Sequence, residues 1–275
     1  MEQLHGKVAV VTGAGSGIGR ALAARLVAEG MRVVAADIEV DALAGTARHT
    51  DVASTFVTDV ANAGDVDALA EHVYETFGGV DLLCNNAGVF AGGLIWELPA
   101  SDFDWTLGVN LWGILHAVRA FVPRMIDARR EAHIVNTVSM AGIVTMPYTG
   151  PYNVSKFAAL AATESLAHDL AVVGAPIGVS AVVPSLVATR IAQSGRNRPG
   201  ALAAPRSEDA RFVEQALADS TASAGIDPTE VAAIIVDAVR TNTYLVPTKP
   251  SYTMQVRDRA AALVDRRLPP MPEID

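Results

Sequence analysis

The sequence predicts a single-domain α/β fold: a doubly wound parallel sheet of about seven strands with helices on both faces. Short β-branched runs alternate with segments of helical periodicity along most of the chain, and a glycine-rich turn joins the first strand to the first helix. Strands that alternate with helices pair in parallel. At 275 residues and 51% hydrophobic content the chain can bury one large core, so we expect one domain over residues 1–275.

The first strand and its turn indicate a nucleotide. Residues 7–12 form a continuous apolar run, residues 18–30 have helical periodicity, and the segment 13–19 between them is glycine-rich. Glycines let the backbone approach a pyrophosphate, whose charge is then met by free N–H groups and by the positive end of the helix dipole. A single turn of this kind is weak evidence, so the other strand ends must decide.

The second predicted strand, residues 31–36, ends in an acid. Asp37 follows it about 20 residues beyond the turn, where a carboxylate can accept hydrogen bonds from an adenosine ribose. The alternative is an Asp that caps the next helix. A carboxylate repels a 2′-phosphate, and the positions where a basic residue would offset it hold Ser16 and Ile38. NAD is therefore favoured over NADP.

The remaining elements continue the alternation. We expect further strands at 54–58, 80–84, 132–137, 177–183 and 244–247, and helices at 65–77, 101–126, 209–222, 228–241 and 255–267. Ligands of such sheets bind at the carboxyl ends of the strands. Gly13, Asp37, Asp59 and Asn86 all fall at such ends, which predicts one shared site.

A candidate general acid/base is Tyr152, which Lys156 accompanies. Tyr152 and Lys156 are four residues apart, so on a helix they share one face, and the ammonium would lower the tyrosine pKa from its ordinary value near 10. The alternative is an ordinary amphipathic helix. Ser139 follows the predicted strand 132–137. Asn110 lies in the middle of the apolar helix predicted over 101–126, where a side-chain amide either faces water or has a functional role.

These residues together resemble the short-chain dehydrogenase/reductase family, whose fold is Rossmann-like, from residue 7 to about 189. The segment from Thr12 to Gly19 resembles its cofactor turn, and Asn85 to Gly88 its sheet-stabilising motif. The set that resembles its catalytic tetrad is Asn110, Ser139, Tyr152 and Lys156. The resemblance implies an NAD(P)-dependent enzyme that acts on CH–OH groups.

The resemblance also implies a role for each residue. Tyr152 would exchange the proton of the substrate oxygen that Ser139 orients, Lys156 would hold the nicotinamide ribose, and Asn110 would hold a water linking Lys156 to solvent. Asp59 and Val60 would hold the adenine. Val187 and Thr189 would contact the carboxamide. The full expected cofactor set is Gly13, Ser16, Gly17, Ile18, Gly19, Asp37, Asp59, Val60, Asn86, Ala87, Gly88, Tyr152, Lys156, Pro184, Val187 and Thr189.

The segment after the sixth strand has a different composition. Residues 193–207 are rich in Gly, Pro and Arg, so we expect a substrate lid over about 186–224, with a plain surface excursion as the alternative, and a C-terminal tail over about 251–275. Candidate pocket residues are mostly apolar and predict a hydrophobic secondary alcohol or ketone, although half of them would serve equally well as lid packing. They are Phe90, Trp96, Met140, Met146, Tyr148, Leu186 and Ile191.

Two features depart from the family. Ser185 stands where the family usually has glycine after the proline of strand six, and the chain lacks the common Asp-Gly-Gly ending.

Many members assemble through the helices around Asn110 and Tyr152, so we expect a homodimer or homotetramer.

Composition excludes several other classes. A formal charge of −9 argues against nucleic-acid and anionic-membrane surfaces, and no apolar stretch is long enough to span a bilayer. Cys84 is the one cysteine and lies in an apolar run, which fits a reducing cytoplasm. The six histidines lack the spacing of metal ligands, so no metal site is predicted.

Three other functions remain open from the sequence. The protein is alternatively an NADPH-dependent carbonyl reductase, a non-catalytic dinucleotide-sensing protein, or an epimerase or lyase that uses the cofactor transiently. Asp37 and Ile38 argue against the first, and the intact tetrad argues against the second.

Overall fold

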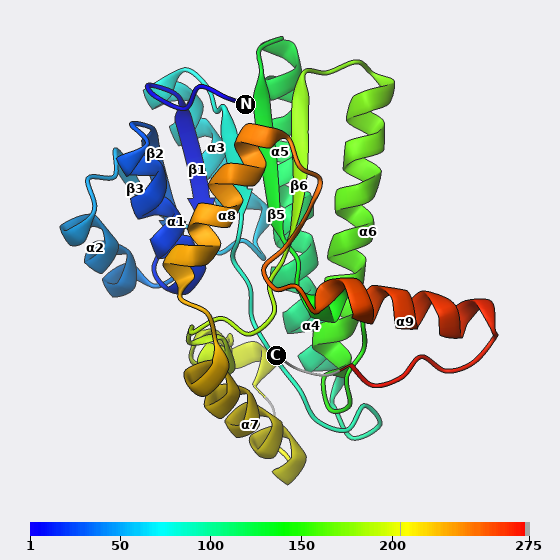
Figure 1. The fold of residues 1–275 in the computed structure, drawn as a ribbon. Coiled ribbons are helices and arrows are strands. Elements are labelled where there is room, and N and C mark those ends of the chain that lie inside the picture. Colours follow the sequence, from blue (N-terminus) through cyan, green and yellow to red (C-terminus); the bar gives the residue numbers. More distant parts are fainter. Residues whose placement is uncertain (204, 273–275) are drawn as a thin grey trace.

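A computed structural model describes residues 1–203 and 205–272. Seven parallel strands form one sheet in the order β3-β2-β1-β4-β5-β6-β7 (Figure 1). Their bounds are β1 Val8–Thr12, β2 Arg32–Asp37, β3 Ser54–Val57, β4 Leu82–Asn85, β5 Ala132–Thr137, β6 Ile177–Val183 and β7 Leu245–Pro247. The predicted doubly wound α/β fold is confirmed.

Helices cover both faces of the sheet (Figure 1). Helices α1 and α8 pack together on one face, whereas α3 and α5 pack on the other with α6 beside them. The helix bounds are α1 Gly17–Ala28, α2 Val40–His49, α3 Ala63–Phe77, α4 Ala100–Leu107, α5 Gly113–Asp127, α6 Gly150–Val172, α7 Glu208–Ala224, α8 Pro228–Thr241 and α9 Tyr252–Val264. The sequence pattern had not indicated α2.

Burial explains why the strands have different compositions. Every residue of β1, β4 and β5 is buried, because helices cover both sides of these central strands. The sequences of β1 and β4 are correspondingly mostly apolar, whereas β5 also buries His133 and Asn136, whose side chains are hydrogen bonded. At the edge, β3 alternates between half-buried and exposed residues. The chain builds the sheet outward from β1 through β2 to β3 and then returns to place β4 on the other side of β1, so a crevice forms at the carboxyl ends of β1 and β4.

Two apolar layers hold the sheet. One contains Leu22 and Leu26 of α1 with Ile235 of α8, and the other contains Leu69 of α3 with Phe121 of α5. These side chains are fully buried, so they keep the strand ends, and therefore the site, in fixed relative positions.

The long helix expected over residues 101–126 is present, but its middle turn is wider than an α-helical turn. A π-helical turn, Gly108–Trp112, separates α4 from α5, and Asn110 lies within it. The Asn110 amide donates to the Val89 carbonyl and accepts from the Val89 N–H, and such side-chain bonding to a neighbouring loop accompanies the wider turn. The helical segment predicted over 101–126 is therefore confirmed, and only the π-helical turn within it was not indicated by the sequence pattern. Helix α9 lies slightly before the predicted 255–267.

Other expectations concern the chain as a whole. Within residues 1–203 and 205–272, no helix combines the length and apolar character needed to cross a membrane, and no cluster of candidate metal ligands occurs. Cys84 is buried, and this burial raises the pKa of its thiol. Residue 204 of the predicted lid and residues 273–275 of the predicted tail lie outside the described residues.

The core predicts a clear stability difference between two phenylalanines. Replacing fully buried Phe121 with alanine leaves a cavity between α5 and the sheet, so we expect Phe121→Ala to lower the free energy of unfolding by about 3–5 kcal/mol. Phe212→Ala is the matched control, because Phe212 is 63% exposed and its loss is expected to cost about 0.5 kcal/mol. Urea unfolding measures both, and equal losses would contradict this account of the core.

Candidate active site

A cavity of about 590 Å³ opens at the carboxyl edge of the sheet. Its walls come from the ends of the central strands, from the start of α6 and from the predicted lid, residues 186–224, which lies beyond the strand ends (Figure 1). The predicted cofactor and catalytic residues that line it are Gly13, Ser16, Gly17, Ile18, Asp37, Asp59, Val60, Asn86, Ala87, Gly88, Ser139, Tyr152, Lys156, Pro184, Val187 and Thr189. Gly19 and Asn110 are not among the lining residues.

The glycine turn has the shape that a pyrophosphate needs. Gly17 has a φ of +49°, and a Cβ there would lie 2.9 Å from Cγ2 of Thr189. A side chain on Gly19 would overlap the Gly13 carbonyl, so Gly19 lets α1 pack on the turn instead of facing the cavity. Ser16 makes no side-chain capping bond, which leaves the first N–H groups of α1 available to an anion.

The Asp37 carboxylate is held by backbone amides at the edge of the cavity. Its Oδ2 accepts from the Gly15 N–H at 2.7 Å and its Oδ1 from the Glu39 N–H at 2.9 Å. Arg20 bonds instead to the carbonyls of Gly15 and Ala42 and does not line the cavity. A cavity lined by a glycine turn and an oriented carboxylate fits the pyrophosphate and ribose of a dinucleotide.

A polar link joins the ends of β1 and β4. The hydroxyl oxygen of Thr12 accepts from the N–H groups of Asn86 and Ala87, at 3.0 and 3.1 Å. The Asn86 side chain donates back to the Thr12 carbonyl at 3.1 Å. This link holds the segment Asn86–Gly88 against the glycine turn, so both face the same cavity.

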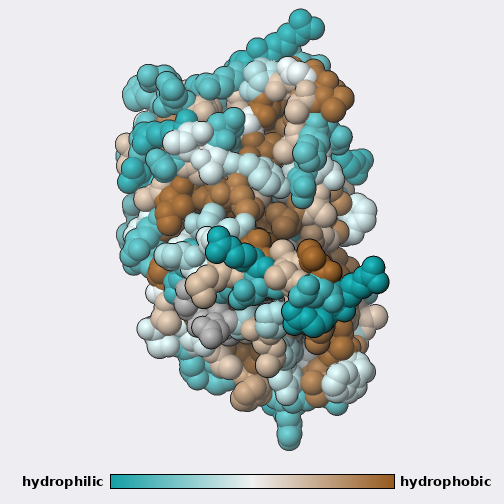
Figure 2. All heavy atoms as spheres, turned by 45° about the vertical axis from the view of Figure 1, so that its right-hand side comes forward, coloured by the Kyte–Doolittle hydropathy of each residue, from teal (hydrophilic) through white to brown (hydrophobic). Residues whose placement is uncertain are grey.

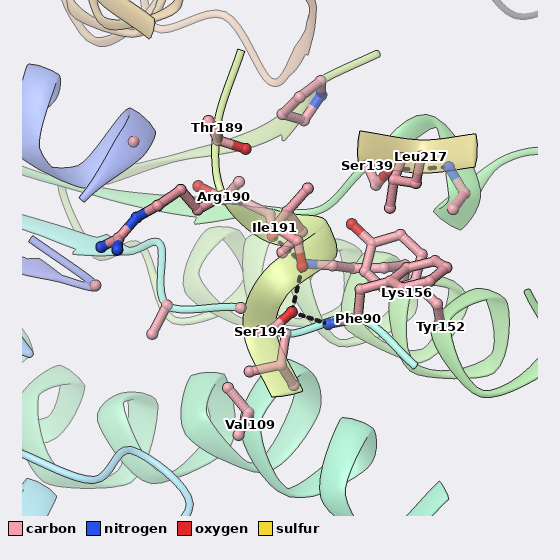
Figure 3. Close-up of a pocket in the computed structure, with 18 of the residues that line it drawn as sticks. Phe90, Val109, Ser139, Tyr152, Lys156, Thr189, Arg190, Ile191, Ser194 and Leu217 are labelled. Carbon is pink, nitrogen blue, oxygen red and sulfur yellow. Dashed lines mark hydrogen bonds between the residues drawn. The ribbon is translucent and has the colours of Figure 1, made fainter. Parts of the chain in front are cut away.

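Tyr152, Ser139 and Lys156 come together at the other end of the cavity (Figure 3). Lys156 is buried; its Nζ donates to the Thr137 carbonyl at 2.9 Å and lies 5.7 Å from the centre of the Tyr152 ring. Ser139 ends the β5 segment, where its Oγ accepts from the Ala141 N–H at 3.1 Å. The Phe90 ring packs 5.2 Å from the Tyr152 ring and covers it.

Burial controls the protonation of both titratable groups. Desolvation raises the pKa of Tyr152, and a hydrogen bond from Ser139 opposes that rise. Desolvation also lowers the pKa of Lys156, to about 7. Among the protein's own groups the predicted lowering of the Tyr152 pKa by Lys156 is therefore not seen, because a cavity of low dielectric disfavours phenolate and ammonium alike. At neutral pH the phenol is a proton donor.

Asn110 supports the site from behind. Its Nδ2 donates to the Val89 carbonyl at 3.0 Å and to the Ser155 hydroxyl at 2.9 Å, while its Oδ1 accepts from the Val89 N–H at 2.9 Å. Both N–H groups of the amide are thus engaged in fixing the loop after β4 against α6. A water held between Asn110 and Lys156 stays a prediction.

The cavity lining beyond the predicted cofactor and catalytic residues is mostly apolar. Of the pocket residues predicted, Phe90, Met140, Met146, Tyr148, Leu186 and Ile191 line it. Trp96 does not: it lies in a turn before α4 and is 76% exposed, so that prediction was wrong. Further apolar residues that the sequence pattern did not indicate also line the cavity: Trp105, Val144, Leu202, Val213, Ala216 and Leu217. The helical spacing of Val213, Ala216 and Leu217 in α7 is the signal that indicates one face of a lid helix.

The lid segment is tied to the body near its start. In Figure 3 the Ser194 hydroxyl accepts from the Phe90 N–H at 2.9 Å and donates to the Ile191 carbonyl. The N–H of Ser185, where the family has glycine, donates to the Thr248 hydroxyl at 3.1 Å, so this position is fastened to the residue after β7.

The chain belongs to the short-chain dehydrogenase/reductase family. The model of the family described as "short chain dehydrogenase" matches residues 7–199. This confirms the resemblance inferred from the motifs and the prediction of an NAD(P)-dependent oxidoreductase acting on CH–OH groups.

Individual relatives agree with this assignment. The chain is 40% identical to a short-chain dehydrogenase/reductase from Burkholderia phymatum solved in complex with NAD, with 99% of each chain covered and a TM-score of 0.96. It is 32% identical to a CLA biosynthesis dehydrogenase/reductase of Lactiplantibacillus plantarum, over 96% of this chain and 95% of the relative. It is 42% identical to a 1-deoxy-11-beta-hydroxypentalenate dehydrogenase of Streptomyces avermitilis, over 68% of this chain and 70% of the relative.

The depressed pKa of Lys156 predicts a pH dependence of stability. The folded-state pKa of about 7 lies below the unfolded value, so the unfolded chain binds more protons between them and stability rises with pH above 7. We expect Lys156→Met to remove this contribution, which is at most about 1.4 kcal/mol per pH unit. Urea unfolding of both proteins between about pH 7 and 9.5 measures the difference. Parallel stability curves would show that Lys156 does not titrate in this range.

Proposed function

We propose that the protein is an NAD-dependent dehydrogenase that transfers a hydride between NAD and the carbinol or carbonyl carbon of a hydrophobic secondary alcohol or ketone. One observation carries this: Tyr152, Ser139 and Lys156 meet at one end of a cavity whose other end is lined by the glycine turn and Asp37. An acid/base group and a dinucleotide cradle in one enclosed space fit hydride transfer coupled to proton transfer.

The protein's own residues would handle the proton and the orientation. A bound nicotinamide ring supplies the hydride acceptor or donor. Tyr152 gives a proton to the substrate oxygen in reduction and takes it in oxidation, and Ser139, beside the phenol, orients that oxygen. Lys156 lies on the same face of α6 as Tyr152, and its ammonium is held by the Thr137 carbonyl of β5. There Lys156 would bind the nicotinamide ribose, and in its charged form it would favour the phenolate of Tyr152.

The edge at Asp37 supports NAD over NADP. Its oriented carboxylate accepts hydrogen bonds from ribose hydroxyls and repels a 2′-phosphate. Arg20 is engaged by backbone carbonyls, and Arg196, which also lines the cavity, is paired with Glu39. The relative from Burkholderia phymatum was solved in complex with NAD, which supports binding of this coenzyme.

The cavity lining supports a neutral, apolar substrate. Phe90 packs against the Tyr152 ring and Leu217 lies on the same side of the cavity in Figure 3, while Val144 and Met146 are further apolar residues of the lining. The guanidinium of Arg190 points away from Tyr152 in Figure 3, so it does not offer a partner for a substrate carboxylate beside the phenol. The name of the Streptomyces avermitilis relative, a dehydrogenase of a hydroxy compound, agrees with oxidation at a hydroxyl-bearing carbon.

Ketone reduction is the second candidate direction. The raised pKa of Tyr152 keeps the phenol protonated at neutral pH, which suits proton donation to a carbonyl oxygen. The rate of alcohol oxidation is then expected to rise with pH, because oxidation needs the phenolate form of Tyr152 as the proton acceptor.

We also propose a cytoplasmic homodimer or homotetramer. Figure 2 brings the side of α6 and α9 forward and shows apolar side chains among hydrophilic ones across this face. Val154 of α6 and Trp112 of the π-helical turn are large apolar residues about half exposed, which fits a surface that a second copy covers.

The proton-transfer role of Tyr152 predicts a large effect of one oxygen atom. The purified protein is mixed with NAD and a panel of hydrophobic secondary alcohols at mildly alkaline pH, and absorbance of reduced nicotinamide is followed. We expect Tyr152→Phe to lower turnover about 10²- to 10⁴-fold, because a general acid/base is removed, while NAD affinity is retained. Tyr74→Phe, a phenol on α3 that bonds the Phe121 carbonyl away from the cavity, is the control.

Two outcomes would contradict the proposal. Wild-type turnover in Tyr152→Phe would remove the tyrosine from the chemistry. NAD binding in calorimetry without turnover of any alcohol or ketone would favour a sensing role over a dehydrogenase.

The coenzyme preference is tested separately at Asp37. We expect Asp37→Ala to narrow the ratio of kcat/KM for NAD over NADP by about tenfold or more, because it removes both the ribose acceptor and the repulsion of a 2′-phosphate. Asp41→Ala, the same change at an exposed position in the first turn of α2, is expected to leave the ratio unchanged. A wild-type protein that is faster with NADP would reject the preference.

A further inference from the structure

The lid is fastened to three separate elements within residues 194–198. Ser194 bonds the loop after β4 through the Phe90 N–H. Arg196 and Asn197 bond Glu39, at the junction of β2 and α2. Arg198 forms an ion pair with Asp102 of α4 in a separate contact. The segment therefore crosses the cavity like a strap with an attachment on each side.

The attachment at Glu39 concentrates three donors on one oxygen. Its Oε1 accepts from Nε and Nη2 of Arg196, at 3.0 and 2.6 Å, and from Nδ2 of Asn197 at 2.9 Å. The remaining nitrogen of Arg196 donates to the Gln193 carbonyl at 2.9 Å, so the guanidinium is positioned by the lid itself. We call Glu39, Arg196 and Asn197 the latch.

The latch lies at the adenosine edge of the cavity. The Glu39 N–H donates to Asp37, whose other carboxylate oxygen accepts from the Gly15 N–H. A continuous polar chain thus runs from the glycine turn through Asp37 and Glu39 to the lid. Asp37 and all three latch residues line the cavity, so a dinucleotide seated between the glycine turn and Asp37 has the latch beside its ribose.

The two sides of the strap differ in burial. Arg198 and Asp102 are 16% and 9% exposed, and Arg198 also donates to the Ser101 hydroxyl at 3.1 Å and lies 5.4 Å from the centre of the Trp105 ring. Arg196 and Glu39 are 29% and 24% exposed. Water and salt compete more strongly for the less buried pair, so the latch is the weaker of the two attachments.

We propose that the latch closes the lid over the adenosine half of the bound coenzyme and that its opening limits the rate at which reduced coenzyme leaves. This inference rests on the proposed function, since it requires a dinucleotide in the cavity. Glu39 and Arg196 act as positioning residues: they hold the lid and need not touch the reacting atoms.

The charge state of the latch agrees with this role. The hydrogen bond from Arg196 holds the pKa of Glu39 below its ordinary value, with Asn197 and the charge of Arg190 adding to the effect, so Glu39 is ionised at neutral pH. Because the pair is partly exposed, added salt is expected to weaken it and to speed coenzyme release.

The test measures NADH dissociation by stopped flow: protein loaded with NADH is mixed with excess NAD, and nicotinamide fluorescence is followed. We expect Glu39→Gln and Arg196→Gln each to speed dissociation about three- to tenfold. The double variant is expected to dissociate no faster than the single ones, because both act through the same contact. Glu71→Gln, which breaks the exposed pair with Arg124 on α3 and α5, is the matched control and should leave the rate unchanged.

Salt dependence supplies a readout that a general loosening of the fold would not reproduce. Sodium chloride should speed release from the wild type and have a smaller effect on Glu39→Gln, and equal thermal unfolding midpoints would show that the variants are folded. Unchanged dissociation rates, or additive effects in the double variant, would overturn the latch while leaving the proposed function intact. Failure of the wild type to bind NADH would overturn both.

Discussion

The site depends on the position of β1 in the middle of a parallel sheet. Because β2 and β4 flank it and all strands run in one direction, the glycine turn, Asp37 and Asn86 emerge at the same edge. The bonds between Thr12 and the segment that begins at Asn86 then hold the two halves of the sheet in register at that edge. The cavity lies at this edge because the helices that connect the strands cover the two faces of the sheet and not the carboxyl ends of the strands.

Desolvation is the second physical condition of the site. Burial disfavours the charged forms of both Tyr152 and Lys156. The phenol is therefore protonated at neutral pH, and the pKa of the neighbouring Lys156 is lowered to about 7. The same enclosure gives the substrate end its apolar walls, with Phe90 on the tyrosine ring and the lid helix opposite. The proposed proton transfer at Tyr152, the proposed apolar substrate and the proposed lid therefore all depend on one enclosed space.

Much of the site could be predicted from local sequence, and the reasons differ between residues. Gly13, Asp37 and Asn86 were recognisable because a strand end places each of them, and Tyr152 with Lys156 because a helix spacing does. Trp96 and Trp105 could not be told apart in this way. Both are apolar residues near a candidate pocket, but only the fold turns one toward solvent and the other toward the cavity.

The sequence by itself determined the alternation of strands and helices apart from α2, the strand-end motifs and the family, because these follow from periodicity and from short-range backbone requirements. Only the tertiary structure decided the π-helical turn at Asn110, the direction of the tyrosine pKa shift and the pairing of Glu39 with Arg196. Each of these depends on groups far apart in the chain, whose desolvation and hydrogen bonding arise only when the fold brings them together.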